Sequence, residues 1–479
     1  MNPRAPELPR TARPILGRGP ARAAAGLSAA LATAVLLFAC DCDSTPPGAA
    51  GPAERASPAN SRPSVVYIII DTLRADKLGA YGFGKETSPE IDALAAKGVR
   101  FDRVISQCSW TRPSIGGMVT GIHPRRLGLY KERAERLPEN AVCLSERFHE
   151  AGYTTVGVTA NPNINSVFGF DQGFDRYADS NRVWPWMKRD EEQQRARRGN
   201  LMPANDVFET ALELAREAGP PPYYLQLNIM EMHTYGARVR EEYADHFGDV
   251  KNARYLNALR QVSADIGAFV ERLGKTPGFE HTLLALTSDH GEGLDDHPGI
   301  PGAAYHGNVL YESQLHVPWI LYDSAGALPA GRVVKRPVRN LEIAPTLADI
   351  VGLAPLEPAH GISLLPLLDD PEAEVALPEN FVAETYFRKN DKIGVYSTSW
   401  KYFEHRDDWR GLNPRELQKK GGEERGAETD ELPEHPDIAG ELDRHLTAWE
   451  SLYPKIPPTT DIDISPEETE QLKALGYID

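Results

Sequence analysis

One run of apolar residues constrains the fold of this chain more than any other stretch. Residues 65–70 read Val-Val-Tyr-Ile-Ile-Ile and contain no charged residue. A β-branched run without alternation is typical of a central parallel strand that is buried on both faces. Asp71 follows the run, and in open α/β sheets ligand sites form beyond the carboxyl ends of the strands. Asp71 is therefore a candidate ligand for a metal ion or substrate, although an Asp after a strand is more often a helix cap.

Two further apolar runs also end in polar residues that can bind a metal. Residues 223–229 precede His233, and residues 282–287 precede Asp289 and His290. A carboxylate and an imidazole side by side on a turn suit a divalent metal ion. Further strands are predicted over residues 99–105 and 154–158, and helices over residues 88–98, 144–151, 203–218 and 255–273. The alternation predicts an α/β fold with a mostly parallel sheet and helices on both faces.

The segment around Thr111 contains a candidate nucleophile. Pro113-Ser114, followed by small and apolar residues, predicts the first turn of a buried helix with Thr111 just ahead of it. Free backbone N–H groups at a helix start favour an anion, so a hydroxyl at this place could attack a charged ester. Taken alone, the pattern favours an ordinary N-cap. The metal-type residues elsewhere in the chain favour the nucleophile.

The first 63 residues predict an export signal and a tether. Five arginines within residues 1–22 precede a small, apolar stretch over residues 23–39. The stretch ends in Leu-Phe-Ala-Cys40, which resembles a bacterial lipobox and predicts a lipoprotein signal peptide over residues 1–40. A plain signal peptide and an N-terminal membrane anchor are the alternatives. All three place the folded part outside the cytoplasm. A lipid on Cys40 would anchor it to a membrane of the cell envelope, facing the periplasm or the exterior. Residues 41–63, rich in Pro, Ala, Gly and Ser, predict a disordered tether.

The net charge bears on the class of binding partner, and the cysteine content bears on disulfide formation. The chain of 479 residues has a net charge of -17 and no basic patch in its folded part, which argues against nucleic-acid binding. Of its cysteines, Cys108 and Cys143 fall in the folded part. They could pair in an oxidising compartment, but no spacing rule demands it.

With these residues and His306 in view, the chain resembles the sulfatase family of the alkaline-phosphatase superfamily. The resemblance rests on an ordered set of motifs rather than on one of them. The motifs are Ile70–Asp76, Pro113–Gly128, Gly169–Phe174, Asp289–Glu292, Val317–Ile320, Glu342–Leu347 and Gly361–Leu368. The resemblance implies an alkaline-phosphatase-like α/β/α sandwich over residues 64–371 and a smaller C-terminal α+β subdomain over residues 372–479. In the subdomain, strands are predicted near 381–385, 392–397 and 400–403, an exposed charged loop over 418–433, and helices over 441–452 and 466–475.

The resemblance also implies a metal centre between strand ends. A divalent ion (Ca, Mg, Mn or Zn) is expected on Asp71, Asp289, His290 and the nucleophile oxygen of Thr111. His233 falls where sulfatases keep a His that binds the anion or protonates the leaving oxygen. His306 falls near a position that is often a Lys contacting the substrate anion. A hydrogen-bonded loop histidine is the alternative for both of them.

The chain departs from the sulfatase pattern at the nucleophile. Typical members carry Cys-x-Pro-x-Arg, whose Cys becomes formylglycine. Here Thr111 takes the Cys slot and Ile115 the Arg slot, and Arg112 could supply the missing positive charge. A rival register on Cys108 and Arg112 places Trp110 where Pro belongs. Thr72 replaces a second Asp ligand, and His290 replaces the usual Asn.

These departures bear on the substrate. An Asp, a Thr and an adjacent Asp-His pair, here Asp71, Thr111 and Asp289-His290, are instead the pattern of superfamily members that transfer or hydrolyse phosphoryl groups. A Thr ester lacks the second hydroxyl through which formylglycine sheds sulfate, whereas metal-activated water can clear a phosphothreonine. We therefore expect a metal-dependent hydrolase of sulfuric or phosphoric esters (monoesters, diesters or phosphonates). The alternatives are an envelope transferase of phospho-groups and a catalytically inactive, lipid-tethered anion-binding protein.

Overall fold

The computed structural model describes residues 62–130, 135–179, 202–236, 239–300, 302–388, 390–406, 412–422, 424, 426–459, 462, 464–475 and 477. Residues 59–479 form one compact unit. The predicted signal peptide over residues 1–40, with Cys40, and nearly all of the tether over residues 41–63 lie outside the described residues. No helix in the described part of the chain is both long and apolar enough to cross a bilayer.

The large sheet runs in the order β4-β3-β5-β1-β6-β7-β2-β8, and β9 pairs with β2. Its strands are β1 (Ser64–Ile70), β2 (Val99–Ile105), β3 (Thr154–Thr159), β4 (Arg176–Ala178), β5 (Tyr223–Ile229), β6 (Thr282–Thr287), β7 (His316–Asp323), β8 (Arg332–Val334) and β9 (Val338–Arg339). Every recorded pairing is parallel except those of β7 with β6 and β2. The predicted mostly parallel α/β sheet is confirmed.

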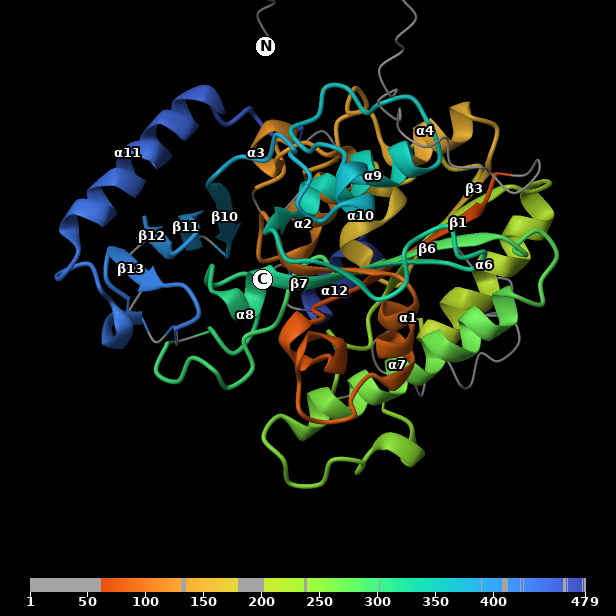
Figure 1. The fold of residues 1–479 in the computed structure, drawn as a ribbon, viewed down its shortest axis with the longest axis horizontal. Coiled ribbons are helices and arrows are strands. Elements are labelled where there is room, and N and C mark those ends of the chain that lie inside the picture. Colours follow the sequence, from red (N-terminus) through yellow and green to blue (C-terminus); the bar gives the residue numbers. More distant parts are fainter. Residues whose placement is uncertain are drawn as a thin grey trace, which may run out of the picture. The chain divides into compact units, whose positions relative to one another are not determined.

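Helices cover both faces of this sheet (Figure 1). On one face lie α2 (Thr111–Thr120), α4 (Leu144–Glu150), α9 (Ile343–Ile350) and α10 (Leu365–Asp369). On the other lie α1 (Pro89–Lys97), α6 (Ala204–Ala218) and α7 (Ala253–Leu273). The short helices α3 (Pro124–Leu127) and α8 (Glu312–Leu315) lie in connections. The expected α/β/α sandwich is therefore observed.

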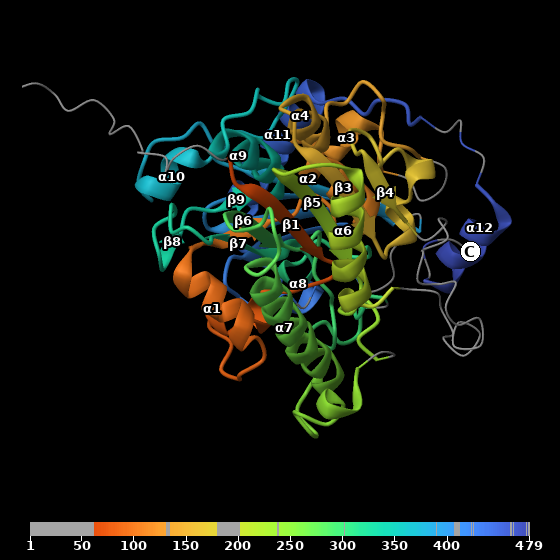
Figure 2. The ribbon, with the colours of Figure 1, turned by 90° about the vertical axis from the view of Figure 1, so that its right-hand side faces the viewer.

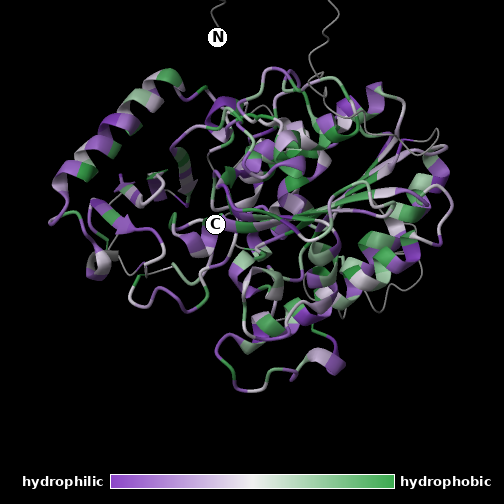
Figure 3. Ribbon diagram, in the orientation of Figure 1, coloured by the Kyte–Doolittle hydropathy of each residue, from purple (hydrophilic) through white to green (hydrophobic). Residues whose placement is uncertain are grey.

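The apolar run in β1 is buried because it faces both layers. Val65, Tyr67 and Ile69 belong to the core beneath α2 and α4, whereas Val66 and Ile68 belong to the core beneath α6 and α7. Full burial of one such aliphatic side chain stabilises the fold by about 1.5–3 kcal/mol. In Figure 3 the central strands are hydrophobic, while the covering helices are hydrophobic on part of their surface.

A second, antiparallel sheet of order β10-β11-β12-β13 forms the predicted C-terminal α+β part. It comprises β10 (Phe381–Phe387), β11 (Asn390–Tyr396), β12 (Trp400–His405) and β13 (Arg415–Lys419), and α11 (Pro436–Leu452) packs on one face. The prediction of an exposed loop over residues 418–433 is wrong in part, since β13 enters it and Glu424 is buried against Lys401, 2.9 Å away. Glu424 is thus paired rather than solvated, whereas Lys419 and Glu428 are exposed as predicted.

The chain ends beside the large sheet. Helix α12 (Pro466–Ala474) lies at the margin of the unit in Figure 2. Leu472 and Tyr477 belong to the same apolar core as β1 and α2. The subdomain boundary at residue 372 remains a prediction, and Leu472 and Tyr477 contribute to the core of the large-sheet part.

Candidate active site

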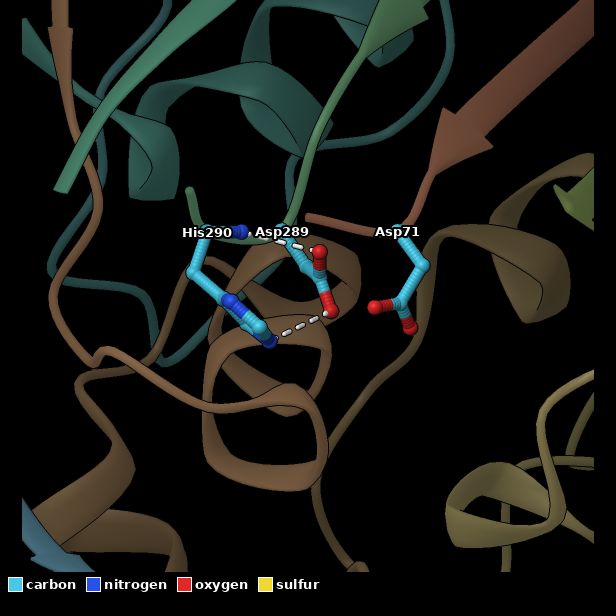
Figure 4. Close-up of side chains that lie close together, drawn as sticks. All are labelled: Asp71, Asp289 and His290. Atoms are coloured by element: carbon cyan, nitrogen blue, oxygen red, sulfur yellow. Dashed lines mark hydrogen bonds and ion pairs between the residues drawn. The ribbon is translucent and has the colours of Figure 1, made fainter. Parts of the chain in front are cut away.

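Three of the predicted ligands meet at one edge of the large sheet. Asp71 follows β1 directly, and Asp289 and His290 follow the neighbouring parallel strand β6. Their ligand atoms all lie within 4.8 Å of one another, and all three side chains are fully buried. Figure 4 shows the two carboxylates facing each other with the His290 ring alongside. The parallel register of β1 and β6 is the cause, since it brings both strand ends to the same edge.

The hydrogen bonds around these ligands leave one oxygen of each carboxylate without a partner. Oδ1 of Asp289 accepts from the backbone N–H groups of Thr72 and His290, at 3.2 and 2.8 Å. To present its N–H, Thr72 adopts a left-handed backbone (φ 56°), which is uncommon for a β-branched residue. Oδ2 of Asp289 and Oδ1 of Asp71 are buried and have no hydrogen-bond partner.

The donor set therefore fits a divalent cation. Nδ1 of His290 lies 2.9 Å from the carbonyl oxygen of Gly291. A carbonyl can only accept, so Nδ1 carries the proton and Nε2 keeps its lone pair toward the carboxylates. Burial and the neighbouring Asp289 raise the pKa of Asp71, because two close carboxylates repel in a dry site. Two carboxylate oxygens and one imidazole nitrogen suit a divalent metal, and a bound cation would offset this repulsion.

Thr111 brings its hydroxyl to the same place. Thr111 is the first residue of α2 and Trp110 is the N-cap, so the helix begins two residues before Pro113, where the sequence predicted its start. Pro113 is tolerated there because backbone N–H groups in the first turn have no partner within the helix. Oγ1 of Thr111 lies 3.4 Å from Oδ2 of Asp71 and 3.3 Å from Nε2 of His290. The structure brings these side chains together, while the assigned roles remain predictions.

The two predicted leaving-group histidines lie next to this cluster. The ring of His306 is 4.7 Å from that of His290 and 4.8 Å from that of His233 (centroid to centroid). Burial lowers the pKa of both His233 and His306, so their rings are neutral. Nδ1 of His306 lies 3.2 Å from Oε2 of Glu292, whose pKa burial raises to about 8. Both ring nitrogens of His233 are buried and have no hydrogen-bond partner, which leaves them available to a substrate.

Arg112 is placed differently from the other predicted residues. Its buried guanidinium donates to the backbone and side-chain oxygens of Asn163, at 2.9 and 3.1 Å, and lies 3.6 Å over the ring of Phe168. Its charge is thus held by the loop that follows β3, and its role near the substrate anion remains a prediction. Ile115, in the family's Arg slot, is fully buried in the apolar core.

Two residues of the site were not predicted. Asn161, which follows β3, donates to Oδ2 of Asp71 over 2.6 Å. The hydroxyl of Tyr477 lies 3.2 Å from Oγ1 of Thr111 and 3.2 Å from Nδ2 of Asn161. The strand-end rule applied to β3 would have pointed to Asn161. No local pattern near residue 477 points to this site.

The cysteines take no part in this arrangement. Cys108 and Cys143 are both free and buried, so the pairing left open from the sequence does not occur. Burial raises the pKa of each thiol far above its usual range, which disfavours the thiolate. Cys108 packs in the apolar core, whereas Thr111 faces Asp71 and His290. The geometry thus supports Thr111 rather than Cys108 in the nucleophile slot.

Comparison with known proteins agrees with the fold and the motifs. The delta 4,5-hexuronate-2-O-sulfatase of Bacteroides thetaiotaomicron is 24% identical over 469 residues, covering 85% of this chain and 93% of that protein. Human N-acetylgalactosamine-6-sulfatase is 25% identical, covering 65% of this chain and 67% of that one. The solved phosphonate monoester hydrolase from Silicibacter pomeroyi superposes with a TM-score of 0.62 at 18% identity, covering 82% of this chain and 96% of that chain. The family model for sulfatases matches residues 63–353. The chain therefore belongs to the sulfatase family of ester hydrolases.

Proposed function

We propose that the protein is a metal-dependent hydrolase of sulfuric or phosphoric esters, phosphonate monoesters included, with Thr111 as the nucleophile. One observation carries the proposal. Oγ1 of Thr111 lies within 3.4 Å of Asp71 and His290, in a buried site where Asp71 and Asp289 each keep an oxygen without a hydrogen-bond partner. A hydroxyl beside a cation site is the arrangement that metal-assisted ester cleavage requires.

The position of each side chain in the site suggests its role in the reaction. Asp71, Asp289 and His290 would hold the ion, which when bound lowers the pKa of the Thr111 hydroxyl and neutralises charge on the transferred group. The Thr111 hydroxyl can donate its proton to Oδ2 of Asp71, 3.4 Å away, or to Nε2 of His290, 3.3 Å away. The neutral ring of His233 can offer an N–H to the oxygen of the departing alcohol.

The identity of the transferred group follows from the second half of the reaction. A threonine ester has no second hydroxyl, so a sulfuryl group could not leave by the elimination that formylglycine allows. Attack of water on a phosphoryl or phosphonyl group bound to Thr111 needs no such hydroxyl. This difference favours phosphoric and phosphonic esters. The named activities of the relatives above, which include both sulfatases and a phosphonate monoester hydrolase, keep sulfate esters in the test.

A panel of chromogenic esters tests the proposal. Aryl sulfate, aryl phosphate, bis-aryl phosphate and aryl phosphonate are offered to metal-stripped enzyme, and then with Ca, Mg, Mn or Zn restored. We expect metal-dependent turnover that is lost in Thr111→Ala and kept in part in Thr111→Ser. Thr120→Ala is the matched control, because Thr120 lies in the same helix and donates to the backbone oxygen of Gly116.

Any other result of this ester panel rejects a specific part of the proposed function. Full turnover by Thr111→Ala rejects the nucleophile, and no turnover across the whole panel favours an anion-binding protein. Transfer of the group to an added alcohol in preference to water favours the transferase alternative, and product analysis distinguishes the two.

The cellular location of the protein is a separate proposal. The sequence over residues 1–40 supports export to the cell envelope with a lipid on Cys40. Incorporation of labelled fatty acid into the exported chain, and its loss in Cys40→Ser, tests it. Export without lipid incorporation would leave a plain signal peptide or an unmodified anchor.

A further inference from the structure

The C-terminal segment reaches into the candidate active site through one side chain. Tyr477 is 1% exposed, and its hydroxyl lies 3.2 Å from the Thr111 oxygen. Its ring centroid is 5.5 Å from that of His233 and 6.3 Å from that of His306. The phenol therefore fills the space between the nucleophile and the two histidines assigned to the leaving group.

The hydrogen bonds of this phenol engage the nucleophile itself. A tyrosine hydroxyl is both a hydrogen-bond donor and an acceptor. Nδ2 of Asn161 donates to the Tyr477 oxygen, 3.2 Å away. The phenol proton can then be donated to Oγ1 of Thr111. In this state the nucleophile accepts a hydrogen bond through an oxygen lone pair that an attack would use.

The position of the Tyr477 hydroxyl overlaps the space that a substrate ester needs. The sulfur or phosphorus of an ester has to come within roughly 3–3.5 Å of the attacking oxygen. The Tyr477 hydroxyl already holds a position at that distance, and the side chain of Thr111 is completely buried. The ester and the phenol cannot occupy the same place, so access to Thr111 requires that Tyr477 move.

The segment that carries Tyr477 is suited to leave. Helix α12 has 9 residues, fewer than the roughly 12–15 that a helix needs to persist alone in water. Among the described residues of this segment, the buried apolar side chains are those of Leu472 and Tyr477. Helix α12 takes part in no strand pairing of either sheet, so its release breaks none of those pairings.

We propose that Tyr477 occupies the position of the substrate anion in the substrate-free enzyme, and that the substrate displaces it. The chain's own phenol thus competes with the ester for Thr111 and raises the apparent KM. This inference rests on the proposed function only in taking Thr111 as the residue that an anion approaches. The apparent affinity of a site is proportional to the fraction of molecules in which the site is open, so it falls when that fraction falls.

Kinetics of four variants test the competition. Tyr477→Ala and a chain ending at Leu475 are expected to lower KM, and the inhibition constant of inorganic phosphate, at least about fivefold, with any fall in kcat smaller than about tenfold. Tyr477→Phe keeps the ring and should fall between these and the wild type. Tyr305→Ala is the matched control, because Tyr305 adjoins His306 in sequence but is 65% exposed. A fall in kcat of tenfold or more in both Tyr477 variants would make Tyr477 a catalytic residue and overturn the proposal, as would an unchanged KM.

A second measurement needs neither turnover nor a variant. Metal-loaded wild-type protein is digested with a carboxypeptidase at rising concentrations of inorganic phosphate and, separately, sulfate. Mass spectrometry of the intact chain then follows the loss of Tyr477. Displacement predicts a saturable rise in the rate of that loss, and a rate that either anion leaves unchanged or lowers contradicts it. Faster digestion without turnover of any ester would reject the proposed hydrolase and keep this inference, so the two can fail separately.

Discussion

The side-chain amide of Asn161 donates a 2.6 Å hydrogen bond to Oδ2 of Asp71, although the two residues are 90 positions apart. They are neighbours because β3 and β1 both pair in parallel with β5, so their carboxyl ends lie at one edge. The bond engages one oxygen of Asp71 and leaves Oδ1 without a hydrogen-bond partner, in a residue that clusters with Asp289 and His290. Asn161 therefore orients a proposed metal ligand.

Loss of this amide should weaken the metal centre. Partners that orient a ligand typically contribute 10- to 100-fold in affinity or activity, so we expect Asn161→Ala to lower metal affinity by roughly that factor. Isothermal titration of the metal-free protein measures it without relying on turnover. Asn205→Ala, on the exposed side of α6, is the control. Equal metal affinity in Asn161→Ala and the wild type would show that Asp71 needs no such support.

Binding of the ion should also stabilise the fold. A ligand at 100 times its dissociation constant adds about 2.7 kcal/mol to the free energy of unfolding. We expect a matching rise in the thermal midpoint of the wild type on addition of the preferred metal, and none in Asp289→Asn. Asp245→Asn, at an exposed position before α7, should respond like the wild type. An equal rise in Asp289→Asn would place the ion elsewhere.

A buried ion pair joins the small sheet to helix α3. Arg125, which is 3% exposed, donates from Nη2 to Glu384 of β10 over 2.9 Å. Removal of the arginine leaves the Glu384 carboxylate buried without its hydrogen-bonded partner, and breaking a buried ion pair in this way costs on the order of 3–5 kcal/mol. We therefore expect Arg125→Ala to lower the free energy of unfolding in urea by that order. Arg126→Ala is the control: this neighbouring residue is half-buried and donates to the backbone oxygen of Pro454 rather than to a buried carboxylate, so its loss should lower the free energy of unfolding clearly less. Equal losses in both variants would mean that the pair adds nothing specific.

The sequence predicted the parts of the site that follow from strands. Uninterrupted apolar runs mark β1 and β6, and their parallel direction then places Asp71 beside Asp289 and His290. Asn161 obeys the same rule, but an amide after a strand is too common to stand out. The position of Tyr477 could not be predicted, because it lies 366 residues from Thr111 and depends on the return of the chain's end to the large sheet. The charged stretch before Pro433 was misjudged because burial of Glu424 depends on Lys401, a partner from another strand.

Stability toward acid should depend on His360. Burial and the charge of Arg339 lower the pKa of His360 to about 4. Its Nδ1 accepts a 2.9 Å hydrogen bond from the backbone N–H of His123, which requires a neutral ring nitrogen. The unfolded chain takes up this proton near pH 6.5 and the folded chain only near pH 4, so the contribution is present above pH 6.5 and is lost as the pH falls toward 4.

Urea unfolding between pH 7 and pH 4 measures this effect. We expect the decline in unfolding free energy to be shallower in His360→Asn than in the wild type, since Asn can accept the same hydrogen bond without titrating. His246→Asn, at an exposed position, is the control. Identical slopes in His360→Asn and the wild type would exclude His360 as a source of acid sensitivity.

The central claim is that Thr111 becomes covalently attached to the transferred group, and trapping that species tests it most directly. Metal-loaded enzyme is mixed with the ester it turns over best, quenched in acid within one turnover, and analysed by tandem mass spectrometry. The account predicts one sulfuryl, phosphoryl or phosphonyl group on the Thr111 oxygen, absent from Thr111→Ala and present in Thr120→Ala. Turnover with an unmodified Thr111, or with the group on another residue, would contradict it.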